Sequence, residues 1–268
     1  MTGGRSRPRR RWSALERELR AGGGVLIAGV DEVGRGPLAG PVVACAVVMP
    51  PDAPVIRGVD DSKRLSAAQR VRLAARIRQR ALAIGIGAAS VREIERFNVY
   101  HATVLAMRRA LARLPLLPDH VLVDGNPIRS LAVPHRAVVG GDAQCYSIAC
   151  ASIVAKVTRD RLMTALARRY ADYAWERNVG YATPDHLAAL AARGVTPHHR
   201  RSFCRVAQLA LALGEGTMAE GAADAAHDIE TVVLAESAPG SSDLLLPAAA
   251  PPQADPPRAP HEEPPPAP

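Results

Sequence analysis

The chain has 268 residues, enough for one large domain or two small ones, and 48% of them are hydrophobic, as in a globular protein. Only 3% are aromatic, so the core is expected to be aliphatic. The formal net charge of +8 is unevenly spread, because residues 212–268 carry ten acidic residues and one basic residue, which leaves +17 on residues 1–211. Such a basic body favours either a polyanionic partner such as nucleic acid or a solvated arginine-rich surface.

The termini and the cysteines indicate the cellular compartment in which the protein is expected. No run of about 18 apolar residues could cross a membrane, and the basic N-terminus lacks the apolar stretch of a signal peptide. Four cysteines without C-x-x-C spacing favour reduced thiols in a cytoplasmic protein. Residues 1–23 are expected to form a basic disordered arm, and residues 214–268 an acidic, Pro/Ala-rich disordered tail.

Between these segments, strands and helices alternate. Short β-branched or apolar runs bounded by Gly, Pro or Asp-Gly predict strands at 24–30, 41–49, 83–91, 120–125 and 136–142. Helical periodicity predicts helices at 65–82, 97–114, 143–171, 183–194 and 201–213, with Ser66 and Thr183 as N-caps. This order predicts one α/β domain over residues 24–213, with C-terminal helices added and with antiparallel pairing allowed at the start of the sheet.

The stretch "GVDEVGRG" at residues 29–36 comes close to a phosphate-binding P-loop, which requires G-x-x-x-x-G-K-[ST]. Arg35 stands in place of the lysine, and Gly36 in place of the hydroxyl residue that binds Mg²⁺. Asp31 and Glu32 would also place two negative charges inside the phosphate loop. A P-loop is therefore a poor interpretation.

Carboxylates beside phosphate make chemical sense if divalent cations lie between them. Mg²⁺ and Mn²⁺ prefer oxygen ligands, and two ions about 4 Å apart can activate a water and stabilise the leaving oxygen of a phosphodiester. Strand ends of an α/β sheet are where acids from distant segments can meet. The candidates are the two acids at the end of the first predicted strand, one at the end of the fourth, and one before the long helix: Asp31, Glu32, Asp124 and Asp142.

Each candidate has a structural alternative. Asp124 also fits an Asp-Gly turn, and Asp142 also fits a helix N-cap. Asp31 and Glu32 are harder to explain structurally, because paired acids need partners at the end of an apolar strand. Neighbours on a strand point to opposite faces, so both acids reach one site only if the strand ends or twists there, which the following "VGRG" permits.

Six blocks, in their order and at their separations, resemble the ribonuclease HII family: "GVDEVGRGPLAGPVVACAVV", "DDSKRLS", "VDG", "GDAQCYSIACASIVAKVTRDR", "GYATPDHLAAL" and "TPHHRRSF". The resemblance covers about residues 25–206. It implies an RNase H-like fold, a mixed five-stranded sheet flanked by helices with a C-terminal helical extension. It also implies an endonuclease that cuts the RNA strand of RNA–DNA hybrids and the 5′ side of single ribonucleotides in duplex DNA, leaving 3′-hydroxyl and 5′-phosphate ends.

The resemblance also implies residue roles. The four acids would hold two Mn²⁺ or Mg²⁺ ions. The backbone of Gly34, Arg35 and Gly36 would grip the ribose 2′-OH, the group that distinguishes RNA from DNA. Further substrate contacts would come from Tyr181, stacked on the next deoxyribose, and from Lys63, Ser147 and Lys156. Without the resemblance, a half-buried tyrosine that anchors a loop is the better explanation of Tyr181, and a solvated helix lysine is the alternative for Lys156.

The sequence departs from the family pattern at few positions. Ala182 stands where the family usually has glycine, and Cys150 where it has alanine; neither position is an expected ligand. The expected partners are RNA–DNA hybrid and ribonucleotide-containing duplex DNA, bound by a monomer; a replication-clamp contact of the tail is left open.

Three other interpretations compete. Ribonuclease HIII has a similar fold and carries an extra N-terminal domain, whereas only 23 residues precede the first predicted strand here. A non-catalytic hybrid-binding protein would share the basic surface without needing four acids on it. A P-loop nucleotidase ranks last.

Overall fold

The computed structural model describes residues 13–204 and 206–208. Its centre is a five-stranded sheet with strand order β3-β2-β1-β4-β5. The strands are β1 (Ile27–Val33), β2 (Val42–Val48), β3 (Ala83–Ala89), β4 (His120–Asp124) and β5 (Arg136–Val138). β1, β2 and β3 pair antiparallel, whereas β1, β4 and β5 pair parallel. The predicted mixed α/β sheet is confirmed, and the carboxyl ends of its three parallel strands meet at one edge.

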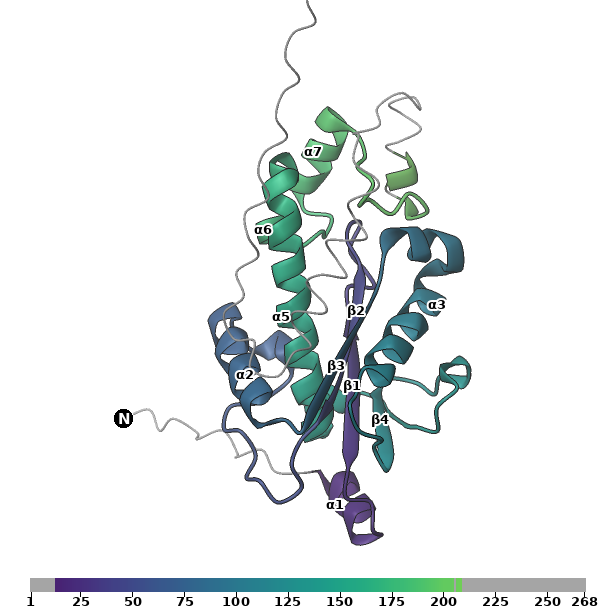
Figure 1. Ribbon diagram of the computed structural model, residues 1–268. Helices are drawn as coiled ribbons and strands as arrows, with labels where there is room; N and C mark the ends of the chain where they lie inside the picture. The colour runs from purple at the N-terminus through teal and green to yellow at the C-terminus, as the bar shows by residue number, and fades with distance from the viewer. Residues whose placement is uncertain (1–12, 205, 209–268) are drawn as a thin grey trace, which may run out of the picture.

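Helices cover both faces of the sheet (Figure 1). The main helices are α2 (Ala67–Arg80), α3 (Val91–Ala112), α4 (Gly141–Gln144) and α5 (Tyr146–Arg169). α3 lies against one face and α5 against the other. Alternation along β1 decides which side chain meets which helix: Ala28 and Val30 pack in the cluster that includes α3, and Ile27 packs against the start of α5. The two clusters are aliphatic, as the composition predicted.

Gly29 lets β1 and α5 approach closely. A Cβ at this position would collide with the backbone of Ser147 and Ile148. The glycine therefore sets the distance between the strand that carries two candidate acids and the longest helix of the protein.

Several helix and strand boundaries differ from the prediction. β1 continues through Asp31 and Glu32 to Val33, three residues beyond the predicted end. α3 begins six residues early, because Ser90 forms a capping box with Glu93 and the helix tolerates a non-helical residue at Asn98. The predicted helix 143–171 is divided at Cys145 into α4 and α5.

The prediction of a disordered arm over residues 1–23 is wrong for residues 14–21, which form helix α1 (Ala14–Ala21). Ser13 caps this helix and Glu16 completes a capping box, the S-x-x-E pattern that begins many helices. Residues 1–12, the acidic tail at 214–268, and residues 205 and 209–213 of the predicted helix 201–213 lie outside the described residues.

Beyond α5 the chain forms α6 (Trp175–Asn178) and α7 (Pro184–Arg193), the predicted C-terminal helical extension. Thr183 caps α7 and Pro184 occupies its first turn, as expected. These elements pack around the fully buried Trp175. All four cysteines are free thiols, and no helix in the described ranges is long and apolar enough to span a membrane.

Candidate active site

Three of the four candidate acids lie on the α5 side of the sheet edge. β1 and β4 are in register with Val30 beside Val123, so Asp31 and Asp124 follow as neighbours at adjacent strand ends. Asp142 lies in the first turn of α4, and the N–H of Gly141 in that turn donates to Oδ1 of Asp124 at 2.6 Å. Three acids that are far apart in sequence are therefore brought together at one edge.

Glu32 reaches this edge from the other face. The expectation that the strand ends at the paired acids is wrong, because β1 keeps its pairing through Val33 and Glu32 opposes Ala44. Alternation then directs Asp31 toward α5 and Glu32 toward the α3 side. Burial raises the pKa of Glu32, and the charge of Asp124 adds to that shift.

The acids repel one another in a poorly solvated place. The pKa of Asp31 is raised well above its usual value by burial, and then by the charges of Glu32 and Asp124. Burial also raises the pKa of Glu32 and of Asp142, and the charge of Asp124 adds to both shifts. Asp124 is thus the shared neighbour of the other three, and the cluster concentrates negative charge that needs a cation to neutralise it.

Each carboxylate is held by its own donor. Asp31 accepts from the N–H of Glu32 at 2.7 Å, Glu32 lies 3.2 Å from the guanidinium of Arg35, and Asp142 lies 3.5 Å from Nζ of Lys63. Among the residues that the structure describes, no three His, Cys, Asp or Glu side chains point at one common centre.

The donor set fits magnesium or manganese. All four groups are carboxylates, with no thiolate or imidazole among them, and hard divalent cations prefer such oxygens. Raised pKa values at Asp31, Glu32 and Asp142 show that their charge is incompletely compensated by the protein.

The loop after β1, which contains Gly34, Arg35 and Gly36 and is called the glycine loop below, lies beside the candidate Tyr181. Gly34 has a φ of 94°, which favours glycine, and a Cβ there would collide with the side chain of Arg159. A Cβ on Gly36 would lie 3.9 Å from the ring of Tyr181, whose side chain is 47% exposed. Leu38 N–H donates to Gly180 O at 2.8 Å, which fixes the two segments together.

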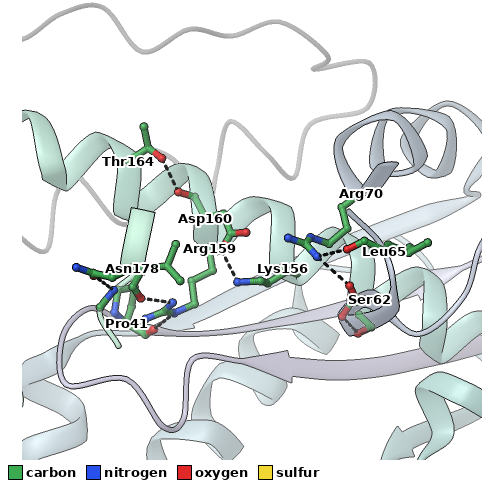
Figure 2. A network of polar contacts seen from close by, with 12 residues as sticks. Pro41, Ser62, Leu65, Arg70, Lys156, Arg159, Asp160, Thr164 and Asn178 are labelled. Carbon is green, nitrogen blue, oxygen red and sulfur yellow. Dashed lines mark hydrogen bonds and ion pairs between the residues drawn. The ribbon is translucent and has the colours of Figure 1, made fainter. Parts of the chain in front are cut away.

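The other predicted contact residues divide into two groups. Lys63 is exposed beside Asp142, whereas Lys156 is partly buried and donates to Asp160 at 2.7 Å (Figure 2). Ser147 has no exposed surface, and its hydroxyl donates to Glu16 at 2.7 Å. A fully buried hydroxyl cannot touch a nucleic acid, so the prediction of a substrate contact at Ser147 is wrong.

Comparisons with known proteins agree with the geometry. The family model for "Ribonuclease HII" matches residues 28–206. The chain belongs to the ribonuclease HII family. It is 60% identical to the ribonuclease HII of Granulibacter bethesdensis, over 73% of this chain and 89% of the relative. The ribonuclease HII of Geobacillus thermodenitrificans is 53% identical, over 74% of this chain and 77% of the relative.

A solved structure extends the ribonuclease HII comparison to the fold. The crystal structure of ribonuclease H2 from Pyrococcus horikoshii superposes with a TM-score of 0.61 at 26% identity, over 69% of this chain and 96% of that chain. Ribonuclease HII enzymes are metal-dependent nucleases that act on RNA–DNA hybrids, and this chain is such an enzyme.

Sequence reasoning missed several residues around the ribonuclease HII site. The charge of Asp61 raises the pKa of Asp142, after the effect of burial, and Ser152 hydrogen-bonds to both Asp31 and Ser62. Glu16 accepts hydrogen bonds from the N–H groups of Tyr146 and Ser147 at the start of α5. The two adjacent acids in "DDSK" are a signal from which Asp61 could have been found. No local pattern identifies Glu16, because its hydrogen-bond partners lie 130 residues away in the sequence.

Proposed function

We propose that this ribonuclease HII hydrolyses the phosphodiester on the 5′ side of a ribonucleotide, in RNA–DNA hybrids and at single ribonucleotides in duplex DNA. The observation that supports this most strongly is the convergence of Asp31, Asp124 and Asp142 on one sheet edge. Burial and mutual repulsion there raise the pKa of Asp31 and Asp142. Such an arrangement suits a cation-dependent reaction, in which divalent ions neutralise the clustered carboxylates.

Asp31, Glu32, Asp124 and Asp142 are the proposed ligands of two Mg²⁺ or Mn²⁺ ions. When bound, such ions polarise the attacking water and stabilise the departing 3′ oxygen. Asp31 is the central ligand, because it is the most buried of the strand acids and its charge is coupled to two others. Ser152 and the N–H of Glu32 orient its carboxylate by hydrogen bonds.

The glycine loop supplies selectivity for ribose in this proposal. The backbone of Gly34, Arg35 and Gly36 binds the 2′-OH, a group that DNA lacks. Tyr181 adjoins Gly36 and is half exposed, which suits a ring that stacks on the sugar of the following nucleotide. Lys63, exposed beside Asp142, and Lys156, on α5 beside Asp160, are the proposed phosphate contacts.

A passive hybrid-binding protein is the rival outside the nuclease class. Each acid at the site would weaken its affinity for phosphate, so a passive binder gains nothing from four of them. Chelation with EDTA would stop cleavage and weaken tight binding by a nuclease, and would leave a passive binder unchanged.

The test is a DNA duplex that contains one ribonucleotide, incubated with the protein with and without Mn²⁺. The expected products carry 3′-hydroxyl and 5′-phosphate ends, and they form only with the metal. Cleavage on the 3′ side of the ribonucleotide, or equal cleavage in EDTA, would contradict the proposal.

The replication-clamp contact stays a prediction. A structure titled as a complex of PCNA and RNase HII from Archaeoglobus fulgidus has a similar fold at 24% identity, a likeness that speaks for the fold alone. The acidic tail of the present chain lies outside the described residues.

A further inference from the structure

Two arginines are buried directly beneath the glycine loop. Arg159 extends from α5, and Arg200 follows α7; each has 0% of its surface exposed. Arg200 is placed there by backbone pairing, because its N–H donates to Leu38 O at 2.8 Å and Gly40 N–H donates to His198 O at 2.9 Å. The C-terminal extension and the glycine loop therefore form one packed unit.

Arg200 binds the carbonyls of the loop that carries the proposed ribose contacts. Its Nη2 donates to Gly34 O at 2.5 Å and to Gly40 O at 2.7 Å. Its Nη1 donates to Arg35 O at 2.8 Å, and its Nε donates to Gly40 O at 3.1 Å. One planar guanidinium therefore fixes three peptide groups at both ends of the loop.

Arg159 binds further carbonyls of the same loop, including that of Pro41 (Figure 2). Its Nε donates to Pro41 O at 3.0 Å and its Nη2 donates to Ala39 O at 3.1 Å. Its Nη1 donates to Val179 O at 2.9 Å, two residues before Tyr181. The same side chain therefore joins the glycine loop to the segment that carries the proposed stacking tyrosine.

Both arginines are charged, and backbone carbonyls are their partners. Burial lowers the pKa of Arg159 to about 10, and burial together with the charge of Arg159 lowers the pKa of Arg200 to about 9. Both values leave the side chains protonated at neutral pH. Within the described residues neither guanidinium forms an ion pair with an acid. Burying two such charges costs free energy. Their presence therefore indicates that their geometry has a role.

The geometry of the peptide bond says what that purpose is. In a trans peptide the carbonyl and the following N–H point in opposite directions. Because Arg200 draws the carbonyls of Gly34 and Arg35 inward, the N–H groups of Arg35 and Gly36 point outward. Both of these residues are exposed.

We propose that Arg200 and Arg159 are positioning residues, which hold the N–H groups of Arg35 and Gly36 toward the substrate and thereby set the preference for ribose over deoxyribose. This rests on the proposed function, in which that loop contacts the 2′-OH. Lysine would keep the charge but lose the fork that reaches several carbonyls at once, so the loop could turn its N–H groups away.

The experiment measures binding of two labelled duplexes, one with a single ribonucleotide and one entirely of DNA, by fluorescence anisotropy in Mg²⁺. Asp31→Asn is present throughout to block hydrolysis. Arg78→Lys is the matched control, because Arg78 is a buried arginine of α2 that donates to Thr158 at 3.2 Å. Arg200→Lys is expected to lower the ratio of the two dissociation constants by about ten-fold or more, and Arg78→Lys to leave it within about two-fold.

An unchanged ratio in folded Arg200→Lys would overturn the inference. So would equal loss of affinity for both duplexes, the result expected of a purely structural arginine. If Asp31→Asn alone shows no preference for ribose, the proposed function itself fails instead.

A second measurement keeps the test valid if the lysine variant does not fold. In wild-type protein labelled with ¹⁵N, the amide signals of Arg35 and Gly36 are expected to shift on addition of an RNA–DNA hybrid in Ca²⁺, more than on addition of the DNA duplex. Equal shifts with both duplexes would contradict the loop contact on which the inference rests, and with it the proposed function.

Discussion

Two buried charged regions lie on either side of the loop after β1, and they are built in opposite ways. At the sheet edge, Asp31 and its acidic neighbours repel one another, and burial raises the pKa of Asp31 further. Beneath the loop, the guanidinium groups of Arg159 and Arg200 donate hydrogen bonds to the backbone carbonyls of the loop. The acids carry unbalanced charge, whereas every guanidinium nitrogen of the two arginines donates to a backbone carbonyl.

The difference indicates that the acids take part in the reaction, whereas the arginines hold the loop in place. Unbalanced carboxylates lower stability and become useful only when a cation neutralises them. Satisfied guanidiniums fix a loop rigidly, which is what recognition of one hydroxyl requires. A substitution at the acids should therefore abolish cleavage while sparing or improving stability, whereas a substitution in the supporting networks should lower stability or alter recognition while leaving the acids in place.

The largest expected effect is on catalysis. Asp31→Asn should lower the cleavage rate by more than about 100-fold, since even loss of an outer partner of a metal ligand costs 10–100-fold. It should also raise the melting temperature in EDTA, because a buried, repelled charge is removed. Asp172→Asn is the control, an acid 58% exposed on its side chain and far from β1 in sequence. Wild-type cleavage by Asp31→Asn would contradict the assignment.

Glu16 should behave as a support residue. Its buried carboxylate accepts hydrogen bonds at the start of α5, so Glu16→Ala should cost about 3 kcal/mol and lower the melting temperature by roughly 10 °C. Glu18→Ala, on the same helix with a 73% exposed side chain, should change it little. Chemical denaturation measures both, and equal small effects would show that α1 does not hold α5.

The buried histidines should make stability depend on pH. Burial and the neighbouring histidines lower the pKa of His199 to about 3, from 6.5. The unfolded chain therefore binds this proton first, and stability falls as the pH drops below 6.5, by about 2 kcal/mol at pH 5.

Replacing His199 removes that dependence. His199→Asn should flatten the plot of unfolding free energy between pH 6.5 and 5, whereas His101→Asn, at an exposed position, should leave the slope as in wild type. An identical slope in both variants would show that His199 is protonated in the folded protein.

The smallest expected effect on stability is at Lys63. Its side chain is 82% exposed beside Asp142, so Lys63→Ala should change the free energy of unfolding by less than about 1 kcal/mol. The same variant should raise KM for the duplex, since a positive charge near the phosphates is lost. An unchanged KM at low salt would show that Lys63 does not contribute to substrate binding.

The features that could be predicted from the sequence are those that depend on residues close together in the chain. Strand alternation and caps are local, so the sheet and the N-caps Ser66 and Thr183 could be predicted. The partnership of Glu16 with α5, and of Arg200 with the loop, spans more than a hundred residues and leaves no local pattern. Ser147 was misjudged for the same reason, because its place on the helix does not reveal what covers it.

Thermal unfolding in EDTA and in saturating Mn²⁺, with wild-type protein and Asp31→Asn side by side, tests most directly whether the acids form a cation site. The account predicts that Mn²⁺ at about 100 times its dissociation constant raises the wild-type melting temperature by roughly 5–10 °C and leaves that of Asp31→Asn nearly unchanged. Equal rises in both proteins would contradict it.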